Sequence, residues 1–199
     1  FSKEPIDSLS DLSGSKVAGA GMNLRYLEGL DNAAGVRGGL TDFYNMLQTG
    51  LVDNAMLWPE AAKTFKIAEV APYMLKADLG AVNSKTITVN KDYWDKLPDE
   101  VKEVLQDVAV AYRDHVAGVA MDRAEASRAA YVESGGTIVE MDPAERAQWA
   151  ANMPNIAVEW AADLDTKGEP GSDMLKSYTA KLKEAGHTPV RDWSAELTQ

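Results

Sequence analysis

The segment Gly19–Tyr26 carries the side chains best suited to hold an anion. Its sequence, GAGMNLRY, predicts the end of a strand, a glycine turn and the start of a helix that includes Asn23. Free backbone N–H groups at a helix start favour an anion. Arg25 lies in the first turn, where its guanidinium could clamp a carboxylate through two parallel hydrogen bonds. The competing interpretation is a surface arginine on a short helix, with glycines that only make the turn. Arg37 is a second candidate cation.

Met56 and Trp58 end the next predicted strand, immediately before Pro59 opens a helix. Ligand crevices in α/β folds lie at the carboxyl ends of strands. Trp58 could therefore stack on a flat ligand or form an apolar wall, although core packing against the following helix is the competing interpretation. Asn83 lies between two predicted strands, where the chain could cross between lobes.

The motifs of enzymes and metal sites do not occur in this sequence. There is no Cys, which excludes disulfides, thiolate metal sites and Cys nucleophiles. The two histidines, His115 and His187, lack the spacing of metal ligands, and no Gly-x-Ser-x-Gly elbow, phosphate loop or GxGxxG motif is present. We therefore predict no catalytic residues, no metal site and no cofactor, and keep a small-molecule enzyme of the α/β type as an alternative.

The charge balance limits the possible partners. The sequence has 20 Lys and Arg against 31 Asp and Glu, which gives a net charge of -11. This argues against nucleic acid, whose phosphates need a basic surface. No segment approaches the roughly 18 apolar residues of a membrane span, so the chain is not expected to cross a membrane. An anionic ligand would have to be held locally, by Arg side chains and backbone N–H groups.

Strands and helices alternate along the chain, which predicts an α/β architecture. The expected strands lie at Lys16–Ala20, around Val36, and at Val52–Leu57, Tyr73–Lys76, Ser84–Asn90 and Thr137–Met141. The expected helices are Asn23–Leu30, one from Thr41 or Asp42 to Gly50, Pro59–Val70, Asp92–Leu97, a long one from Pro98 to about Val132, one that Asp142 caps, Asn155–Asp165 and Gly171–Ala185. At 1.5 Å per residue the long helix is roughly 50 Å, more than the width of one lobe, so it is expected to span two.

Four blocks of sequence, in order, resemble the solute-binding proteins of tripartite ATP-independent periplasmic (TRAP) transporters, the DctP-like family. They are Ser8–Val17, Thr41–Asp53, Lys66–Tyr73 and Val89–Pro98. The resemblance implies a periplasmic-binding-protein-like fold, with two α/β lobes, a long helix along both, and a ligand in the cleft between them. The lobes of that family close on the ligand by a hinge motion.

The family's first lobe usually occupies roughly a hundred residues before the point at which this sequence starts. The resemblance therefore implies a chain truncated at its N-terminus. Residues 1–80 and 137–199 would form mainly the second ligand-binding lobe with C-terminal helices. Residues 81–136 would supply the return strand of the first lobe and the long spanning helix. The implied protein is periplasmic, delivers its ligand to TRAP membrane subunits, and could dimerise if the first lobe is missing.

The implied ligand is a small organic acid. Many family members carry an Arg two residues after the motif Lys, where this sequence has Ala18. Ala18, Arg25 and Trp58 together favour an aromatic monocarboxylate, similar to benzoate, hydroxybenzoate or phenylacetate. A C4-dicarboxylate or another aliphatic acid is the alternative. The expected ligand-binding residues are Asn23, Arg25, Tyr26, Met56, Trp58 and Asn83.

Overall fold

The computed structural model describes residues 1–80 and 86–198, and it contains two small parallel sheets. Strands β1 (Lys16–Gly19), β2 (Ala34–Arg37) and β3 (Asn54–Ala55) form the first, in the order β2-β1-β3. Strands β4 (Tyr73–Lys76) and β5 (Thr137–Glu140) form the second. The register is Ala18 opposite Val36 and Ala55 in the first sheet. Parallel strands end at the same edge of a sheet, so the segments that follow β1 and β3 lie together.

Residues 1–3, which we call the seam, join the two sheets. The Phe1 ammonium donates to the Ala55 carbonyl at 2.9 Å, and the Ala55 N–H donates back to the Phe1 carbonyl at 2.8 Å. On the other side Ser2 and Tyr73 exchange hydrogen bonds of 2.8 and 3.2 Å. The seam therefore runs antiparallel between β3 and β4 and makes one continuous surface of both sheets.

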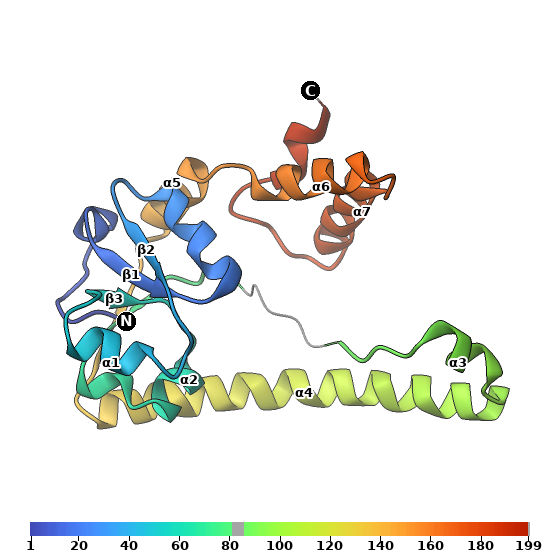
Figure 1. The fold of residues 1–199 in the computed structure, drawn as a ribbon, viewed down its shortest axis with the longest axis horizontal. Helices are drawn as coiled ribbons and strands as arrows, with labels where there is room; N and C mark the ends of the chain where they lie inside the picture. The colour runs from blue at the N-terminus through green and yellow to red at the C-terminus, as the bar shows by residue number, and fades with distance from the viewer. Residues whose placement is uncertain (81–85, 199) are drawn as a thin grey trace.

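Helices cover and extend this surface (Figure 1). Asp142 caps α5 as expected, because its side chain accepts the Ala144 N–H at 2.7 Å. The α-helices are α1 (Phe43–Gln48), α2 (Pro59–Thr64), α3 (Lys91–Lys96), α4 (Asp99–Glu133), α5 (Pro143–Asn152), α6 (Ile156–Thr166) and α7 (Gly171–Glu184). The 3-10 helices are η1 (Leu9–Leu12), η2 (Gly21–Gly29), η3 (Ile67–Glu69) and η4 (Trp193–Thr198).

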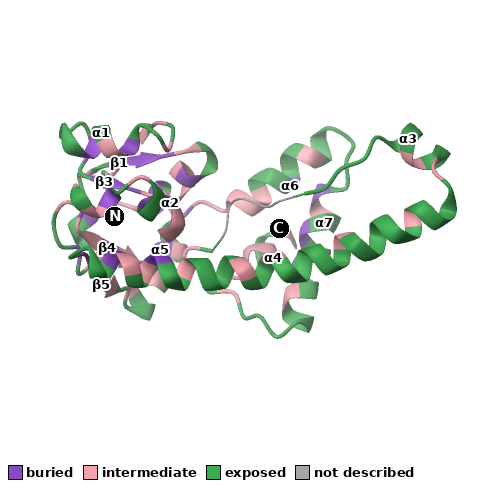
Figure 2. Cartoon of the chain, turned by 90° about the horizontal axis from the view of Figure 1, so that it is seen from below, coloured by how far each residue is buried: buried purple, intermediate pink, exposed green. Residues whose placement is uncertain are grey.

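Two apolar clusters fill the lobe that contains the sheets. The first surrounds Phe43, Leu47 and Ile67, which are fully buried, and it includes Ala18 on β1. The second lies under η2 and α5 and is built from Ile6, Leu12, Trp149 and Met153. Figure 2 shows the buried residues gathered around the sheets and their covering helices, whereas most of α4 is exposed.

The long helix α4 has 35 residues and is about 52 Å long. Its C-terminal part packs on α2 and β5, and the buried Tyr131 hydroxyl donates to the Ala71 carbonyl at 2.7 Å. Its N-terminal part runs away from the lobe toward α3 (Figure 1). There the apolar side chains are exposed, and we call them the α4 stripe: Val101, Val104, Leu105, Val108 and Tyr112.

Helices α6, α7 and η4 pack on one another near the C-terminus (Figure 1). Arg191 fastens this unit to α5, because its Nη1 donates to the carbonyls of Ala150 and Met153 at 2.9 and 2.5 Å. The guanidinium also stacks on Trp193, 4.4 Å from the ring centroid. Among the described residues, no helix is long and apolar enough to cross a membrane.

Three expected elements differ from the structure. Residues 84 and 85 lie outside the described residues, and residues 86–90 form no strand, so that prediction is wrong for them. Alternating side chains define a strand only when a neighbouring strand pairs with it, and Ile87 and Val89 are exposed here. The strand expected at Val52–Leu57 shrinks to Asn54–Ala55. The helix expected to run from Pro59 to Val70 ends at Thr64, because Lys66 adopts a left-handed conformation with φ 54°.

Candidate functional site

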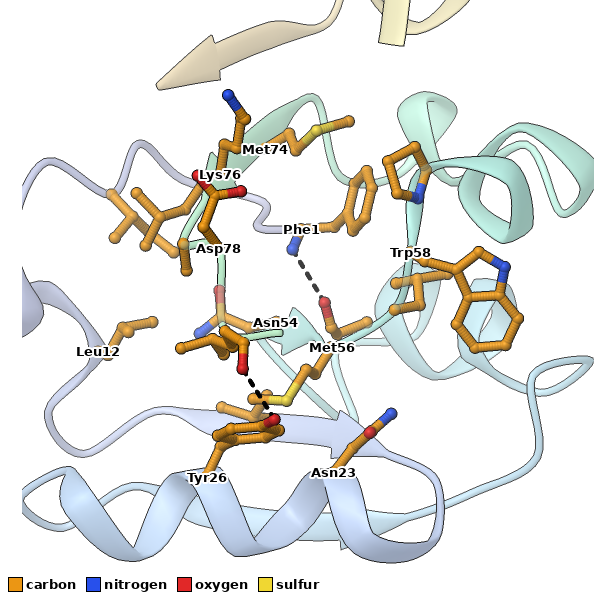
Figure 3. Close-up of a pocket in the computed structure, with 18 of the residues that line it drawn as sticks. Phe1, Leu12, Asn23, Tyr26, Asn54, Met56, Trp58, Met74, Lys76 and Asp78 are labelled. Carbon is orange, nitrogen blue, oxygen red and sulfur yellow. Dashed lines mark hydrogen bonds between the residues drawn. The ribbon is translucent and has the colours of Figure 1, made fainter. Parts of the chain in front are cut away.

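A cleft of about 860 Å³ opens beside the seam, at the carboxyl ends of β1, β3 and β4 (Figure 3). One wall comes from η2 and the opposite wall from β4 and the residues after it. The segment between β3 and α2 forms a third side. Most of the lining is apolar, with Val17, Leu27, Leu57, Met74 and Leu79 among its side chains.

Four residues expected at the site line this cleft together: Asn23, Tyr26, Met56 and Trp58. Asn23 is 8% exposed and belongs to η2. Trp58 is 41% exposed, and it precedes the first residue of α2 in an extended conformation. In Figure 3 Tyr26 lies between Leu12 on one side and Asn23 on the other. Met56 and Trp58, which were selected because they end a predicted strand, thus line the same cavity as residues of η2. Asn83 lies outside the described residues.

Tyr26 connects two walls of the cleft. Its hydroxyl donates to the Leu79 carbonyl at 2.9 Å, and its own carbonyl accepts the Trp149 indole N–H at 2.8 Å. Partial burial raises the pKa of the Tyr26 hydroxyl, so it stays a donor at neutral pH. The chain that leaves β4 is therefore held against η2 by this residue.

Arg25 is directed at carboxylates on the helices, and it is not among the lining residues of the cleft. Its Nη2 donates to Glu159 on α6 at 2.7 Å, and its Nε lies 2.5 Å from Glu28. The hydrogen bond that Arg25 donates to Glu159 is the main cause of the raised pKa of Arg25. The buried Nε has no well-aligned hydrogen bond among the described residues, so the contact with Glu28 is an ion pair only. Ala18, at the family's Arg position, is fully buried in the apolar cluster.

Several polar groups in the cleft were not expected from the sequence. Asn54 on β3 is 6% exposed and lines the cleft next to the seam. Lys76 is the last residue of β4 and Asp78 lies two residues further on, and both line the cleft. Asp78 has a positive φ of 48°. Arg128 reaches the cleft from α4, and Glu60 reaches it from α2. The strand-end rule could have found Lys76 and Asp78, whereas Arg128 depends on how α4 crosses the lobe.

The seam also contributes to the cleft, through Phe1. In a chain that begins at Phe1, burial lowers the pKa of its ammonium from 8.0 to about 6. Its hydrogen bond to Ala55 appears in Figure 3. The Phe1 ring meets the Tyr131 ring edge-on, with centroids 5.4 Å apart.

An apolar cavity with a few converging polar groups is typical of a site that binds a small molecule. The amides of Asn23 and Asn54 can donate and accept hydrogen bonds, and Trp58 can stack on a ring. The described residues contain no group of three or more His, Cys, Asp or Glu that could hold a metal ion.

Comparison with known proteins places the chain among binding proteins. The model of the family described as bacterial extracellular solute-binding protein, family 7 (DctP), matches residues 1–163. The C4-dicarboxylate-binding periplasmic protein DctP of Rhodobacter capsulatus is 32% identical over 145 residues, which cover 72% of this chain and 41% of that protein. The ectoine-binding periplasmic protein TeaA of Halomonas elongata is 25% identical over 149 residues, 71% of this chain and 41% of TeaA. The chain thus spans about two fifths of the length of these curated relatives.

Solved structures show the same fold. A TRAP periplasmic solute-binding protein from Desulfovibrio salexigens, an open complex with the C-terminus of a symmetry mate in its ligand-binding site, superposes with a TM-score of 0.77 and 22% identity. The match covers 94% of this chain and 59% of that chain. A second protein from Desulfovibrio salexigens, with bound orotic acid, superposes with a TM-score of 0.73 and 18% identity, over 92% of this chain and 58% of that one.

Proposed function

Because the chain belongs to bacterial extracellular solute-binding protein family 7, we propose that it captures a small organic acid anion and delivers it to the membrane subunits of a TRAP transporter. The observation that carries this proposal is the cleft where Asn23, Tyr26, Met56 and Trp58 meet. The family and the periplasmic location expected from the sequence are both confirmed, since both curated relatives are periplasmic members of this class. The protein binds its solute without changing it, in keeping with a family of solute-binding proteins.

An aromatic monocarboxylate, similar to benzoate, hydroxybenzoate or phenylacetate, is the ligand class we favour. The exposed face of Trp58 and the apolar walls support a ring-shaped ligand. Ala18 is buried in the core, so the position that often holds the ligand carboxylate in this family contributes no charge here. The ligand contacts in this proposal are Asn23, Tyr26, Met56 and Trp58.

A C4-dicarboxylate is the second candidate, because the Rhodobacter capsulatus relative is a C4-dicarboxylate-binding protein. The two candidates differ in charge and in shape. A dicarboxylate needs two cationic contacts and gains little from an aromatic wall, whereas a benzoate-like ligand needs one cation and a flat apolar surface.

Thermal-shift measurements and calorimetry test both candidates. Benzoate, 4-hydroxybenzoate and phenylacetate should raise the melting temperature of the protein, as a ligand of the native state does. Trp58→Ala should weaken their binding by roughly 10-fold, because stacking contributes on the order of 1 kcal/mol beyond area burial. Trp160→Ala is the matched control, since Trp160 is similarly exposed, at 45%, but lies on α6 and is not among the lining residues. Stabilisation by succinate and not by the aromatic acids would reject the aromatic class.

Self-association is part of the same proposal only if the family's first lobe is missing from the protein. The α4 stripe exposes Val104 by 61% and Val108 by 59%, and a second copy packed along α4 would bury both. Analytical ultracentrifugation should then show a dimer that Val104→Asp and Val108→Asp dissociate. A monomer at all concentrations would remove self-association and leave the ligand proposal intact.

A further inference from the structure

We propose that Arg128 on α4 receives the carboxylate of the ligand. This inference rests on the proposed function, since it needs an organic acid in the cleft. A carboxylate taken from water into an apolar cavity is costly unless a charged donor meets it. Ala18 supplies none, and the Arg25 guanidinium is held by Glu28 and Glu159. Among the described residues, the candidates for this cation are therefore the other basic side chains that line the cleft.

Two cations are among the described residues that line the cleft, Lys76 and Arg128. The Lys76 ammonium donates to both carboxylate oxygens of Glu140 on β5 at 3.1 Å. In Figure 3 this ammonium lies beyond β4, on the side away from Tyr26. The aliphatic part of the Lys76 side chain therefore lines the cleft, whereas its ammonium forms an ion pair between β4 and β5.

Arg128 has donors to spare. Its Nε and Nη2 donate to a single oxygen of Glu125, at 3.1 and 2.5 Å. Its Nη1 has no hydrogen-bond partner among the described residues, while the side chain as a whole is only 28% exposed. A planar guanidinium with a free edge matches a carboxylate through two parallel hydrogen bonds.

The existing partner of Arg128 is easily exchanged. Glu125 lies three residues away on the same helix and its side chain is 74% exposed. Exposed pairs of this kind contribute little to stability, because water screens both charges. A ligand carboxylate in the less polar cleft offers a stronger interaction, so the guanidinium gains by turning toward it.

The charges around the cleft also indicate how many carboxylates the ligand carries. Glu60 and Asp78 line the same cavity as Lys76 and Arg128, so the part of the lining that the structure describes has two acidic and two basic side chains. With Lys76 engaged by Glu140, a single cation is available and two acids remain. A second carboxylate on the ligand would meet repulsion from Glu60 or Asp78. This arrangement selects a monoanion over a dianion.

Isothermal calorimetry on the protein expressed from its complete gene tests the assignment. The probe is benzoate, or succinate if only succinate raises the melting temperature, with benzamide or succinamide as the neutral counterpart. Stabilisation by succinate alone would overturn the selection of a monoanion. Arg128→Gln should weaken binding of the acid by roughly 10- to 100-fold, and it should leave the weaker binding of the neutral amide unchanged. Arg128→Lys should recover part of the loss. Arg113→Gln is the matched control, because Arg113 also lies on α4 and pairs with an exposed carboxylate, Asp114.

The outcomes separate the assignment from the proposed function. If Arg128→Gln binds the acid as tightly as the wild type, the assignment is wrong while the proposed function stands. The same conclusion follows if Arg25→Gln, and not Arg128→Gln, weakens binding of the acid. If neither benzoate nor succinate binds to the wild type, the proposed function and the assignment both fail. Melting temperatures measured without ligand show that each variant is folded, and little change is expected for an exposed ion pair.

Discussion

The Tyr26 hydroxyl should contribute measurably to the stability of the lobe through one hydrogen bond. Tyr26→Phe removes the donor to the Leu79 carbonyl, which lies 2.9 Å away. The substitution keeps the ring that lines the cleft, and it keeps the backbone carbonyl that accepts the Trp149 indole N–H. The change in stability therefore measures the one hydrogen bond between η2 and the chain that leaves β4.

The expected loss follows from the surroundings of this bond. A typical intramolecular hydrogen bond contributes about 1 kcal/mol net, and a buried carbonyl left without a donor costs about 1–3 kcal/mol. Leu79 is half-buried in the lining of the cleft, so we expect a loss of about 1–2 kcal/mol. For a domain of this size each kcal/mol lowers the melting temperature by roughly 2–4 °C. Urea titration and calorimetry both measure this change, without ligand.

Tyr178→Phe is the matched control. Tyr178 lies on α7 and is 63% exposed, so loss of its hydroxyl should change stability by less than about 0.5 kcal/mol. Equal stabilities of the Tyr26 and Tyr178 variants would refute the idea that the hydroxyl holds the cleft wall.

Three other expectations concern packing and charge. Gly136→Ala should lower the free energy of unfolding by about 3 kcal/mol, because the new methyl would overlap the buried Tyr131 ring. Gly118→Ala, in the middle of α4, should raise it by about 1 kcal/mol. Urea titrations measure both changes, and equal signs would contradict one of the two expectations. Between pH 6 and 8 the unfolded chain binds a proton at the Phe1 amine that the folded chain does not, because its folded pKa is about 6. The stability of a chain that begins at Phe1 should therefore rise with pH by at most about 3 kcal/mol over that window, and N-terminal acetylation should remove the rise. Arg25→Gln should cost less than about 1 kcal/mol, because both of its partners are exposed, and a larger loss in thermal unfolding would show that it anchors α6.

Local sequence signals predicted most of the elements and the fold class. The alternation of strands and helices gave the α/β architecture, and solved structures of the family share it. The run from Pro98 to about Val132 predicted α4 nearly to its last residue, because acids at its start and glycines at its end mark both termini. The strand expected near Ile87 failed because pairing depends on a neighbour that no local pattern specifies. The expected helix from Pro59 to Val70 is interrupted because Lys66 adopts a left-handed conformation. Sequence patterns predict such a conformation for glycine but rarely for other residues.

The candidate site divides in the same way. Met56 and Trp58 were placed at the cleft by a rule about strand ends, and Asn23 and Tyr26 by a glycine turn. Arg25 shares that turn, but the direction of a long side chain is decided by its partners, here Glu159 from a distant helix. Arg128 lines the cavity only because tertiary packing brings α4 there. In the sequence, its spacing from Glu125 indicates only an ion pair on the helix surface.

The seam determines where this lobe can bend. Phe1 and Ser2 bind β3 on one side and β4 on the other through four backbone hydrogen bonds of 2.8 to 3.2 Å. A rotation of one sheet against the other would break the two hydrogen bonds on at least one side of the seam, which favours movement of both sheets as a single body. The chain after β4 is different: Asp78 and Gly80 both have positive φ, and Tyr26 holds the segment by one hydrogen bond at Leu79. Among the described residues, 77–80 are therefore where a closing movement that preserves the seam can turn, and the Tyr26 hydrogen bond adds to the cost of that turn.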